Sequence, residues 1–359
     1  MTAPKHIAIV GAGVIGAVVA YHLARRGAAV TLLERAEPDQ EATAGSFAWF
    51  NAAASHGQDS YYRLRLQSLF EYGRLARETG LPINSSGRVE WREDWDELSA
   101  ESAALAALGY PIHEIDGARL QALEPALKQP PARAVFAEVE GSVEPVEMTR
   151  HLLTKAQSLG ATLRSGTAVN GLSVEAGRVV GLATDNGGLA ADRVVLAAGV
   201  ASESLAAQAG VALPMVNPPG LLIHTAPAAP LLHRVVLSPS LHMKQDPDGR
   251  IVAGRDFGGG PVPNDPWAEG ERLLAGLKDR LAGAESLKLE SVSTALRPTP
   301  RDGFPAVGFA GAPAGLYLAV MHSGITLAPI VGRLAAAEIL DGLDAAPLAP
   351  FRPTRFAGA

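Results

Sequence analysis

Lys5-His-Ile-Ala-Ile-Val-Gly-Ala-Gly-Val-Ile-Gly16 is the stretch that decides the fold, and Val30-Thr-Leu-Leu-Glu-Arg35 follows it at the distance that a βαβ unit requires. The apolar run before Gly11 predicts a buried parallel strand, and Gly11 allows the tight turn after it. Gly13 lets a backbone approach a pyrophosphate, while Gly16 lets the next helix pack close to the strand. The pattern therefore predicts a dinucleotide-binding unit, and its simplest alternative is a glycine-rich turn between a strand and a helix.

The helix after this turn is predicted over Val14 to Arg26, and its N-terminal amides, including those of Val14 and Ile15, would face phosphate groups. Glu34 follows the second strand, where a carboxylate accepts a ribose 2′-hydroxyl and repels a 2′-phosphate. These residues favour FAD or NAD over NADP as the cofactor.

Composition narrows the class of protein further. At 359 residues the chain is longer than one hydrophobic core usually organises, so two domains are expected. A net charge of −6 without a long Lys/Arg block argues against a nucleic-acid partner. The absence of Cys excludes disulfides, thiolate metal sites, a cysteine nucleophile and a cysteinyl-linked flavin.

A metal site is not expected either, because the nine His residues show no metal-ligand spacing. A membrane span is not expected, because no apolar stretch is long enough to cross a bilayer. The cytoplasm is the default compartment, although a chain without Cys fits export equally well. The sequence leaves the oligomeric state open, a homo-oligomer included.

The order of the predicted elements indicates two interleaved domains of an α/β protein. Strands and helices alternate at the beginning, in the middle and at the end of the chain, whereas the intervening segments are typical of antiparallel sheet. We expect a Rossmann-type, doubly wound nucleotide domain made of residues 1–80, 142–215 and 297–359. Residues 81–141 and 216–296 would form an antiparallel-sheet substrate domain.

Two later segments are expected to return to the nucleotide sheet. Asp192-Arg-Val-Val-Leu-Ala-Ala-Gly199 predicts a buried strand that places Ala198 and Gly199 under the cofactor, with a plain parallel strand as the alternative. Near the C-terminus, a strand that starts at Gly315 leads through His322-Ser-Gly324 into a helix predicted over Ile325 to Leu340. The N-terminus of that helix offers a second set of amides to an anion.

With these pieces in place, the chain resembles the FAD-dependent amine and amino-acid oxidases of the D-amino-acid oxidase superfamily, and most closely its glycine oxidase and sarcosine oxidase branch. The resemblance covers nearly the whole length. It rests on the N-terminal fingerprint with Glu34-Arg35, the loop from Thr43 to Asn51, the strand Val194 to Gly199, and two C-terminal motifs. These motifs are Leu296-Arg-Pro-Thr-Pro-Arg-Asp-Gly-Phe-Pro305 and His322-Ser-Gly-Ile-Thr-Leu-Ala-Pro329.

The resemblance implies FAD as the cofactor, bound without a covalent link, and a set of contacts to it. By position, the backbone of Gly324, Ile325, Thr326 and Leu327 would hold the pyrimidine end of the flavin, and Val169 would contact adenine. Arg35 belongs to the fingerprint, and the pyrophosphate and ring contacts would come from Thr43, Ser46, Phe47, Ala48 and Trp49. Plain core packing is the alternative for Trp49.

The resemblance also assigns the substrate carboxylate to Arg297, a role that suits a bidentate guanidinium. The alternative is that Arg297 braces its loop by pairing with Asp302, although Arg301 is the more natural partner for Asp302.

Two histidines complete the catalytic set. His242 stands where related oxidases carry a tyrosine in the substrate pocket, which argues against glycine itself as the substrate. A surface His at a strand end is the alternative for His242. His322 lies in the turn beside the flavin, where structural capping is the alternative to a catalytic role.

We therefore expect an FAD-dependent oxidase of an amine that bears a carboxylate: glycine, an N-substituted glycine or a D-amino acid. A hydride would pass from the α-carbon to flavin N5, the imine would hydrolyse, and oxygen would take the electrons to give hydrogen peroxide. Three alternatives stay open: a dehydrogenase with a quinone or protein acceptor, a tRNA-modifying FAD domain, and a non-catalytic flavin-binding module.

Overall fold

The structure is a computed structural model that describes residues 6–38, 41–55, 57–255 and 260–358. Its first layer is a six-stranded sheet in the order β20-β21-β12-β1-β2-β8, parallel except for β20. The strands come from the beginning, the middle and the end of the chain, as predicted. They are β1 (His6–Val10), β2 (Ala29–Leu33), β8 (Thr162–Arg164), β12 (Arg193–Leu196), β20 (Ala306–Phe309) and β21 (Leu316–Val320).

Alternate side chains of β1 enter two different cores, because successive residues of a strand point to opposite faces of the sheet. Ile7 and Ile9 pack on the face covered by the helices α1 (Val14–Arg25), α5 (Pro145–Ser158) and α8 (Gly324–Asp341). Ala8 and Val10 face the other core. That core is closed by α6 (Ser202–Gln208) and by an antiparallel sheet of β9 (Val169–Glu175), β10 (Arg178–Thr184) and β11 (Gly187–Ala190).

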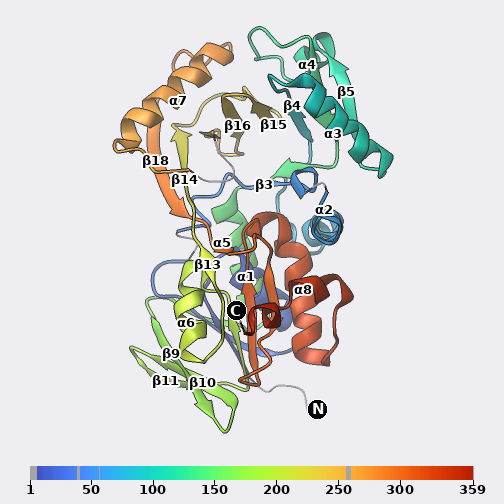
Figure 1. Ribbon diagram of the computed structural model, residues 1–359. Helices are drawn as coiled ribbons and strands as arrows, with labels where there is room; N and C mark the ends of the chain where they lie inside the picture. The colour runs from blue at the N-terminus through green and yellow to red at the C-terminus, as the bar shows by residue number, and fades with distance from the viewer. Residues whose placement is uncertain (1–5, 39–40, 56, 256–259, 359) are drawn as a thin grey trace.

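A second, largely antiparallel sheet of eight strands lies at the opposite end of the molecule, in the upper part of Figure 1. Its order is β18-β14-β17-β16-β15-β4-β6-β5, and only β15 and β4 run parallel. The strands are β4 (Arg88–Glu90), β5 (Ile112–Asp116), β6 (Arg133–Ala137), β14 (Pro219–Thr225), β15 (Val235–Ser238), β16 (Leu241–Gln245), β17 (Ile251–Gly254) and β18 (Leu289–Leu296). The helices beside it are α3 (Trp95–Ala107), α4 (Gly117–Leu123) and α7 (Pro266–Arg280).

Two short ladders and the long helix α2 (Asp59–Thr79) lie between the two sheets (Figure 1). In one ladder β3 (Trp49–Phe50) pairs with β7 (Gly141–Ser142), and in the other β13 (Met215–Val216) pairs with β19 (Thr299–Pro300). The predicted domain boundaries at 141/142 and 215/216 fall inside these short strands, and they stay a prediction. The remaining elements are short stretches of 3₁₀ helix at Ala53–Ser55, Gly199–Ala201, Ala346–Phe351 and Pro353–Phe356.

The predicted fold class is confirmed: the chain is an α/β protein in which a mostly parallel nucleotide-type sheet is interleaved along the sequence with a second, largely antiparallel sheet. Several strands were not predicted, among them β15, whose four residues are all buried and so lack the alternation of a half-exposed strand. In the described part of the chain, no helix is both long and apolar enough to cross a membrane.

The close contact between α1 and the turn after β1 gives a testable prediction. A Cβ atom on Gly16 would lie 1.9 Å from the carbonyl oxygen of Gly11, a backbone atom that cannot move aside without shifting β1. We expect Gly16→Ala to lower the free energy of unfolding in urea by about 1 to 3 kcal/mol or more, as overpacking does. Gly276→Ala in α7 is the matched control, since its Cβ would meet only Leu241 Cδ2, at 3.7 Å. That control should be neutral or stabilising by up to about 1 kcal/mol. Equal stability of the two variants would contradict the packing described here.

Candidate functional site

One cavity of about 870 Å³ runs from the carboxyl edge of the parallel sheet to the second sheet. On one side it is lined by the residues that end β1, β2, β12 and β21, which is where open α/β sheets bind ligands. On the other side it is lined by residues of β14, β16 and β17 and by the residues that follow β18. Every predicted site residue lines this cavity except Gly16 and Leu327, which lie behind its wall.

The glycine-rich turn forms a cradle that side chains would fill. Gly11 has a φ of +99°, and a Cβ atom there would lie 2.5 Å from the carbonyl oxygen of Ala197. Gly13 precedes α1, and its Cβ atom would lie 3.1 Å from Thr43 Oγ1. The same hydroxyl accepts a hydrogen bond from the Val14 amide at 3.4 Å. The N-terminus of α1 therefore opens into the cavity beside the Thr43 hydroxyl, and glycine at 11 and 13 keeps two side chains out of this space, which fits a pyrophosphate.

Glu34 lies at the carboxyl end of β2, and its carboxylate already supports the glycine-rich turn. Its Oε2 accepts from the Ala12 amide at 2.9 Å, and its Oε1 accepts from the Ala36 amide at 3.2 Å. Each carboxylate oxygen can accept a further hydrogen bond, so the group still fits a ribose hydroxyl. Arg35, beside it, forms an ion pair with Glu41 and also lines the cavity.

The loop from Thr43 to Trp49 is held in shape by contacts of its own. Ser46 Oγ accepts from the Ala48 amide at 3.1 Å, and Ala48 adopts a φ of +57°. Gly45 packs so closely on β18 that a Cβ atom would lie 2.3 Å from the Cβ of Ala295. Trp49 both lines the cavity and packs against the apolar cluster of Phe47, Leu222, Val235, Leu237 and Val252, so the two interpretations of this residue are compatible.

The N-terminus of α8 enters the same cavity through Gly324, Ile325 and Thr326. Ser323 precedes it with a φ of 56°, a turn that aims the first free amides of the helix at the cavity. Thr326 Oγ1 accepts from the Asn51 amide and donates to the Trp49 carbonyl, both at 3.4 Å. This helix end is therefore tied to the loop that forms the opposite wall.

Arg297 follows β18, and its guanidinium lies against the backbone of β14. Its Nη1 donates to the Pro219 carbonyl at 2.9 Å, and a Cβ atom on Gly220 would lie 2.3 Å from its Nη2. A glycine at 220 therefore makes room for the guanidinium. Arg297 and Arg301 were the expected partners of Asp302, and this expectation was wrong. Asp302 pairs with Arg355, through contacts of 2.7 and 3.0 Å, because the C-terminal 3₁₀ turns fold back on this loop.

Both predicted histidines line the cavity. His242 lies within β16, between Leu237 of β15 and Gly254 of β17, and is half-buried rather than on the outer surface. Burial, together with the positive charges of Arg297 and Arg65, lowers the pKa of His322 to about 4. His322 is therefore a neutral imidazole at neutral pH, and its Nδ1 lies 3.2 Å from Ser323 Oγ.

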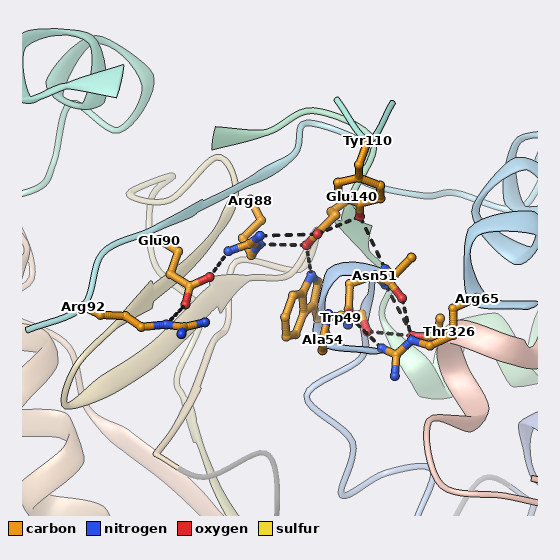
Figure 2. A network of polar contacts seen from close by, with 11 residues as sticks. Trp49, Asn51, Ala54, Arg65, Arg88, Glu90, Arg92, Tyr110, Glu140 and Thr326 are labelled. Atoms are coloured by element: carbon orange, nitrogen blue, oxygen red, sulfur yellow. Dashed lines mark hydrogen bonds and ion pairs between the residues drawn. The ribbon is translucent and has the colours of Figure 1, made fainter. Parts of the chain in front are cut away.

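Arg65 is the main site residue that sequence analysis missed. It projects from α2 with 5% of its surface exposed, and it lines the cavity. It donates from Nε to the Asn51 carbonyl at 2.9 Å and from Nη2 to Asn51 Oδ1 at 2.7 Å (Figure 2). Its Nη1 donates to Ser323 Oγ at 3.3 Å. The sequence does contain a pattern that could have identified Arg65. Helical spacing puts it on one face of α2 with Tyr61, Ser68 and Tyr72, which places an arginine on the buried face of an amphipathic helix.

The two ends of the cavity differ in charge. Carboxylates, those of Glu34, Glu37 and Glu41, line the end beside the glycine-rich turn, whereas the guanidinium groups of Arg65 and Arg297 lie near the neutral His322. The second end therefore suits a small anion. The described residues contain no group of three or more His, Asp or Glu side chains placed to hold a metal ion.

Comparisons with known proteins agree with this geometry. The family model described as DAO, FAD dependent oxidoreductase, matches residues 6–338. A glycine oxidase of Pseudomonas aeruginosa is 31% identical over 96% of this chain and 98% of its own length.

Two solved structures are similar over nearly their whole length. A crystal structure of glycine oxidase from Geobacillus kaustophilus superposes with a TM-score of 0.87 at 26% identity, covering 99% of each chain. A crystal structure of iminodiacetate oxidase from Chelativorans sp. BNC1 gives a TM-score of 0.83 at 26% identity, covering 97% of this chain and 98% of the other. Since the family model spans both sheets and the whole cavity, the chain belongs to the DAO family of FAD-dependent oxidoreductases.

Proposed function

We propose that this chain is an oxidase of a small amine that carries a carboxylate, such as glycine, an N-substituted glycine or a D-amino acid. The observation that carries the proposal is the position of Arg297, whose guanidinium lines the same cavity as the dinucleotide fingerprint. The similar proteins named as oxidases of glycine and of iminodiacetate support it, because both compounds are amines with a carboxylate. Oxygen is the electron acceptor in this proposal, rather than a quinone or a protein.

The residues that would hold FAD follow from the two helix N-termini and from Glu34. The glycine-rich turn with Val14 and Ile15 would hold the pyrophosphate, and Glu34 a ribose hydroxyl. The first amides of α8 would face the pyrimidine end of the flavin. The remaining contacts would come from Arg35, Thr43, Ser46, Phe47, Ala48, Trp49, Val169, Ala198 and Gly199. Bound FAD supplies the hydride acceptor and passes the electrons on to oxygen, which yields hydrogen peroxide.

The side chains of this protein would orient the substrate and keep its amine neutral. Arg297 would hold the carboxylate through two parallel N–H donors, which fixes the position of the α-carbon. The positive charges of Arg297 and Arg65 disfavour an ammonium group nearby, so they lower the pKa of the bound amine and free its lone pair. Once the α-hydride and the amine proton have left, water hydrolyses the resulting imine to a carbonyl compound and ammonia, or a free amine where the nitrogen carries a substituent.

His242 and His322 would line the substrate end without adding charge. The lowered pKa of His322 leaves it neutral, so it can accept or donate one hydrogen bond beside the two cations. His242 would occupy the place that a tyrosine fills in the related oxidases, and it offers a smaller ring with a hydrogen-bonding nitrogen.

The first test concerns the cofactor. We expect the purified protein to carry FAD without a covalent bond, so acid precipitation should release all of the yellow colour into the supernatant. Gly13→Val should abolish FAD retention because its side chain would occupy the cradle, while the apoprotein keeps the urea midpoint of wild-type apoprotein. Colour that stays in the pellet, or a Gly13→Val protein that still binds FAD with wild-type affinity, would contradict this assignment.

The second test concerns the carboxylate. Arg297→Lys removes the bidentate donor while it keeps the positive charge, so we expect kcat/KM to fall by the equivalent of about 2 to 4 kcal/mol. Arg301→Lys is the matched control, because Arg301 is four residues away and does not line the cavity. Wild-type kcat/KM for Arg297→Lys with the best substrate would remove Arg297 from the site.

The third test concerns substrate size. Because the family resemblance places His242 where the related oxidases carry the bulkier tyrosine, we expect N-alkyl glycines or larger D-amino acids to reduce the flavin faster than glycine does. Each well-filled apolar group should gain about 1 to 3 kcal/mol, measured as rates of flavin bleaching in anaerobic mixing. If glycine is the fastest substrate and the larger amines fail to bind, the inference from His242 is wrong.

A further inference from the structure

A fully buried carboxylate, that of Glu140, lies directly behind the indole of Trp49. Glu140 has 0% of its surface exposed and accepts hydrogen bonds from three different side chains. Its Oε2 accepts from Trp49 Nε1 at 2.7 Å and from Arg88 Nε at 2.8 Å, and its Oε1 accepts from the Tyr110 hydroxyl at 2.8 Å. Figure 2 shows these three donors converging on the one carboxylate.

The backbone brings the partners together from distant parts of the sequence. In the β3–β7 ladder, Trp49 pairs with Ser142, two residues after Glu140. Arg88 begins β4, where it pairs with Ala137 of β6 and so lies beside the same segment. Its guanidinium also lies over the Trp49 ring, 5.7 Å from the centroid. The indole is therefore held at its edge by Glu140 and at its face by Arg88.

The network has two branches: the Tyr110 hydroxyl accepts from the Ala52 amide at 3.4 Å, and through Arg88 the network continues away from the cavity toward the surface. Arg88 also pairs with Glu90, and Glu90 pairs with Arg92, whose side chain is 36% exposed. Burying such a chain of charges gains little stability over apolar residues, because desolvation offsets the Coulomb attraction. The network instead fixes the orientation of its side chains, since each donor points at a buried acceptor that is held by other partners. The geometry that matters for the site is that of Trp49, the member of the Glu140 cluster that lines the cavity.

We propose that Glu140 is a positioning residue, which fixes the Trp49 indole as a wall of the cavity and so limits the size of the bound carboxylate ligand. Trp49 packs against the apolar cluster that includes Leu222 of β14, and both residues line the cavity that also contains Arg297. If the indole turned, the space beside these residues would change in shape. Glu140 itself does not line the cavity, so any effect of Glu140 on ligand binding has to pass through another residue.

The test measures the dissociation constants of acetate, propionate and butyrate from the FAD-loaded protein, read as changes in the flavin absorption spectrum. This inference rests on the proposed function for its choice of carboxylate ligands, but none of the three has to be oxidised. A protein that binds them and fails to oxidise any amine would contradict the proposed function and leave this inference standing. The variants are Glu140→Gln, Trp49→Phe, which keeps an aromatic ring without the donor, and the double variant.

We expect Glu140→Gln and Trp49→Phe each to change the ratio of the butyrate and acetate dissociation constants by about fivefold to tenfold, since Phe has no donor and the neutral amide oxygen of Gln is a weaker acceptor than a carboxylate. The double variant should match Trp49→Phe alone, because the proposal routes the effect of Glu140 through the indole and not through Tyr110. With an amine that the protein oxidises, Glu140→Gln should raise KM by a larger factor than it lowers kcat. Tyr110→Phe is the matched control: it removes another donor to Glu140 and the acceptor of the Ala52 amide but leaves the Trp49 contact, so it should lower the melting temperature and keep the wild-type ratio.

A merely structural role predicts a different result. If Glu140→Gln lowers the melting temperature but leaves the butyrate to acetate ratio unchanged, or if its effect multiplies with that of Trp49→Phe in the double variant, the proposal is overturned. Should Glu140→Gln fail to fold, Glu140→Asp retains the charge and shortens the side chain by one methylene. The same ratio then decides the question.

Discussion

The close approach of α1 to the turn after β1 is the constraint on which the rest of this structure depends. Only glycine at 16 lets the helix backbone reach the Gly11 carbonyl, and that contact aims the amides of the first helical turn at the carboxyl edge of the sheet. The helices α5 and α8 pack against α1, so their positions follow from it. The N-termini of α1 and α8 consequently open into one cavity, and the second sheet supplies its opposite wall.

Charge then divides this cavity into two chemically different ends. Near the glycine-rich turn, carboxylates line the wall and suit the hydroxyl groups of a ribose. At the other end, Arg65 and Arg297 present guanidinium groups, while burial keeps His322 neutral. Arg65 is held by a backbone carbonyl, an amide oxygen and a hydroxyl, all neutral acceptors, so its charge is not cancelled by any of these partners. An anionic ligand at this end would therefore gain from both cations, and an ammonium group would not.

Sequence analysis predicted the parts of the molecule that depend on local pattern. The βαβ unit and the strand that leads into α8 are encoded by glycine placement and hydrophobic periodicity over short stretches. The residues chosen from the family resemblance, among them Arg297, His242 and Trp49, line one cavity with the fingerprint, except Leu327. The unpredicted features depend on contacts between distant residues. Asp302 pairs with Arg355, 53 residues later, and Glu140 binds a tryptophan 91 residues before it.

The central claim is that this family member selects its amine through a carboxylate bound beside the flavin. The most direct measurement is anaerobic mixing of the FAD-loaded protein with N-methylglycine and with dimethylamine, which differ only in the carboxylate, and then with D-alanine and ethylamine as a second such pair. Our account predicts that at least one of the two amino acids bleaches the flavin, and that its partner without a carboxylate leaves the flavin oxidised. Equal bleaching by both members of each pair, or bleaching only by the amines without a carboxylate, would contradict it.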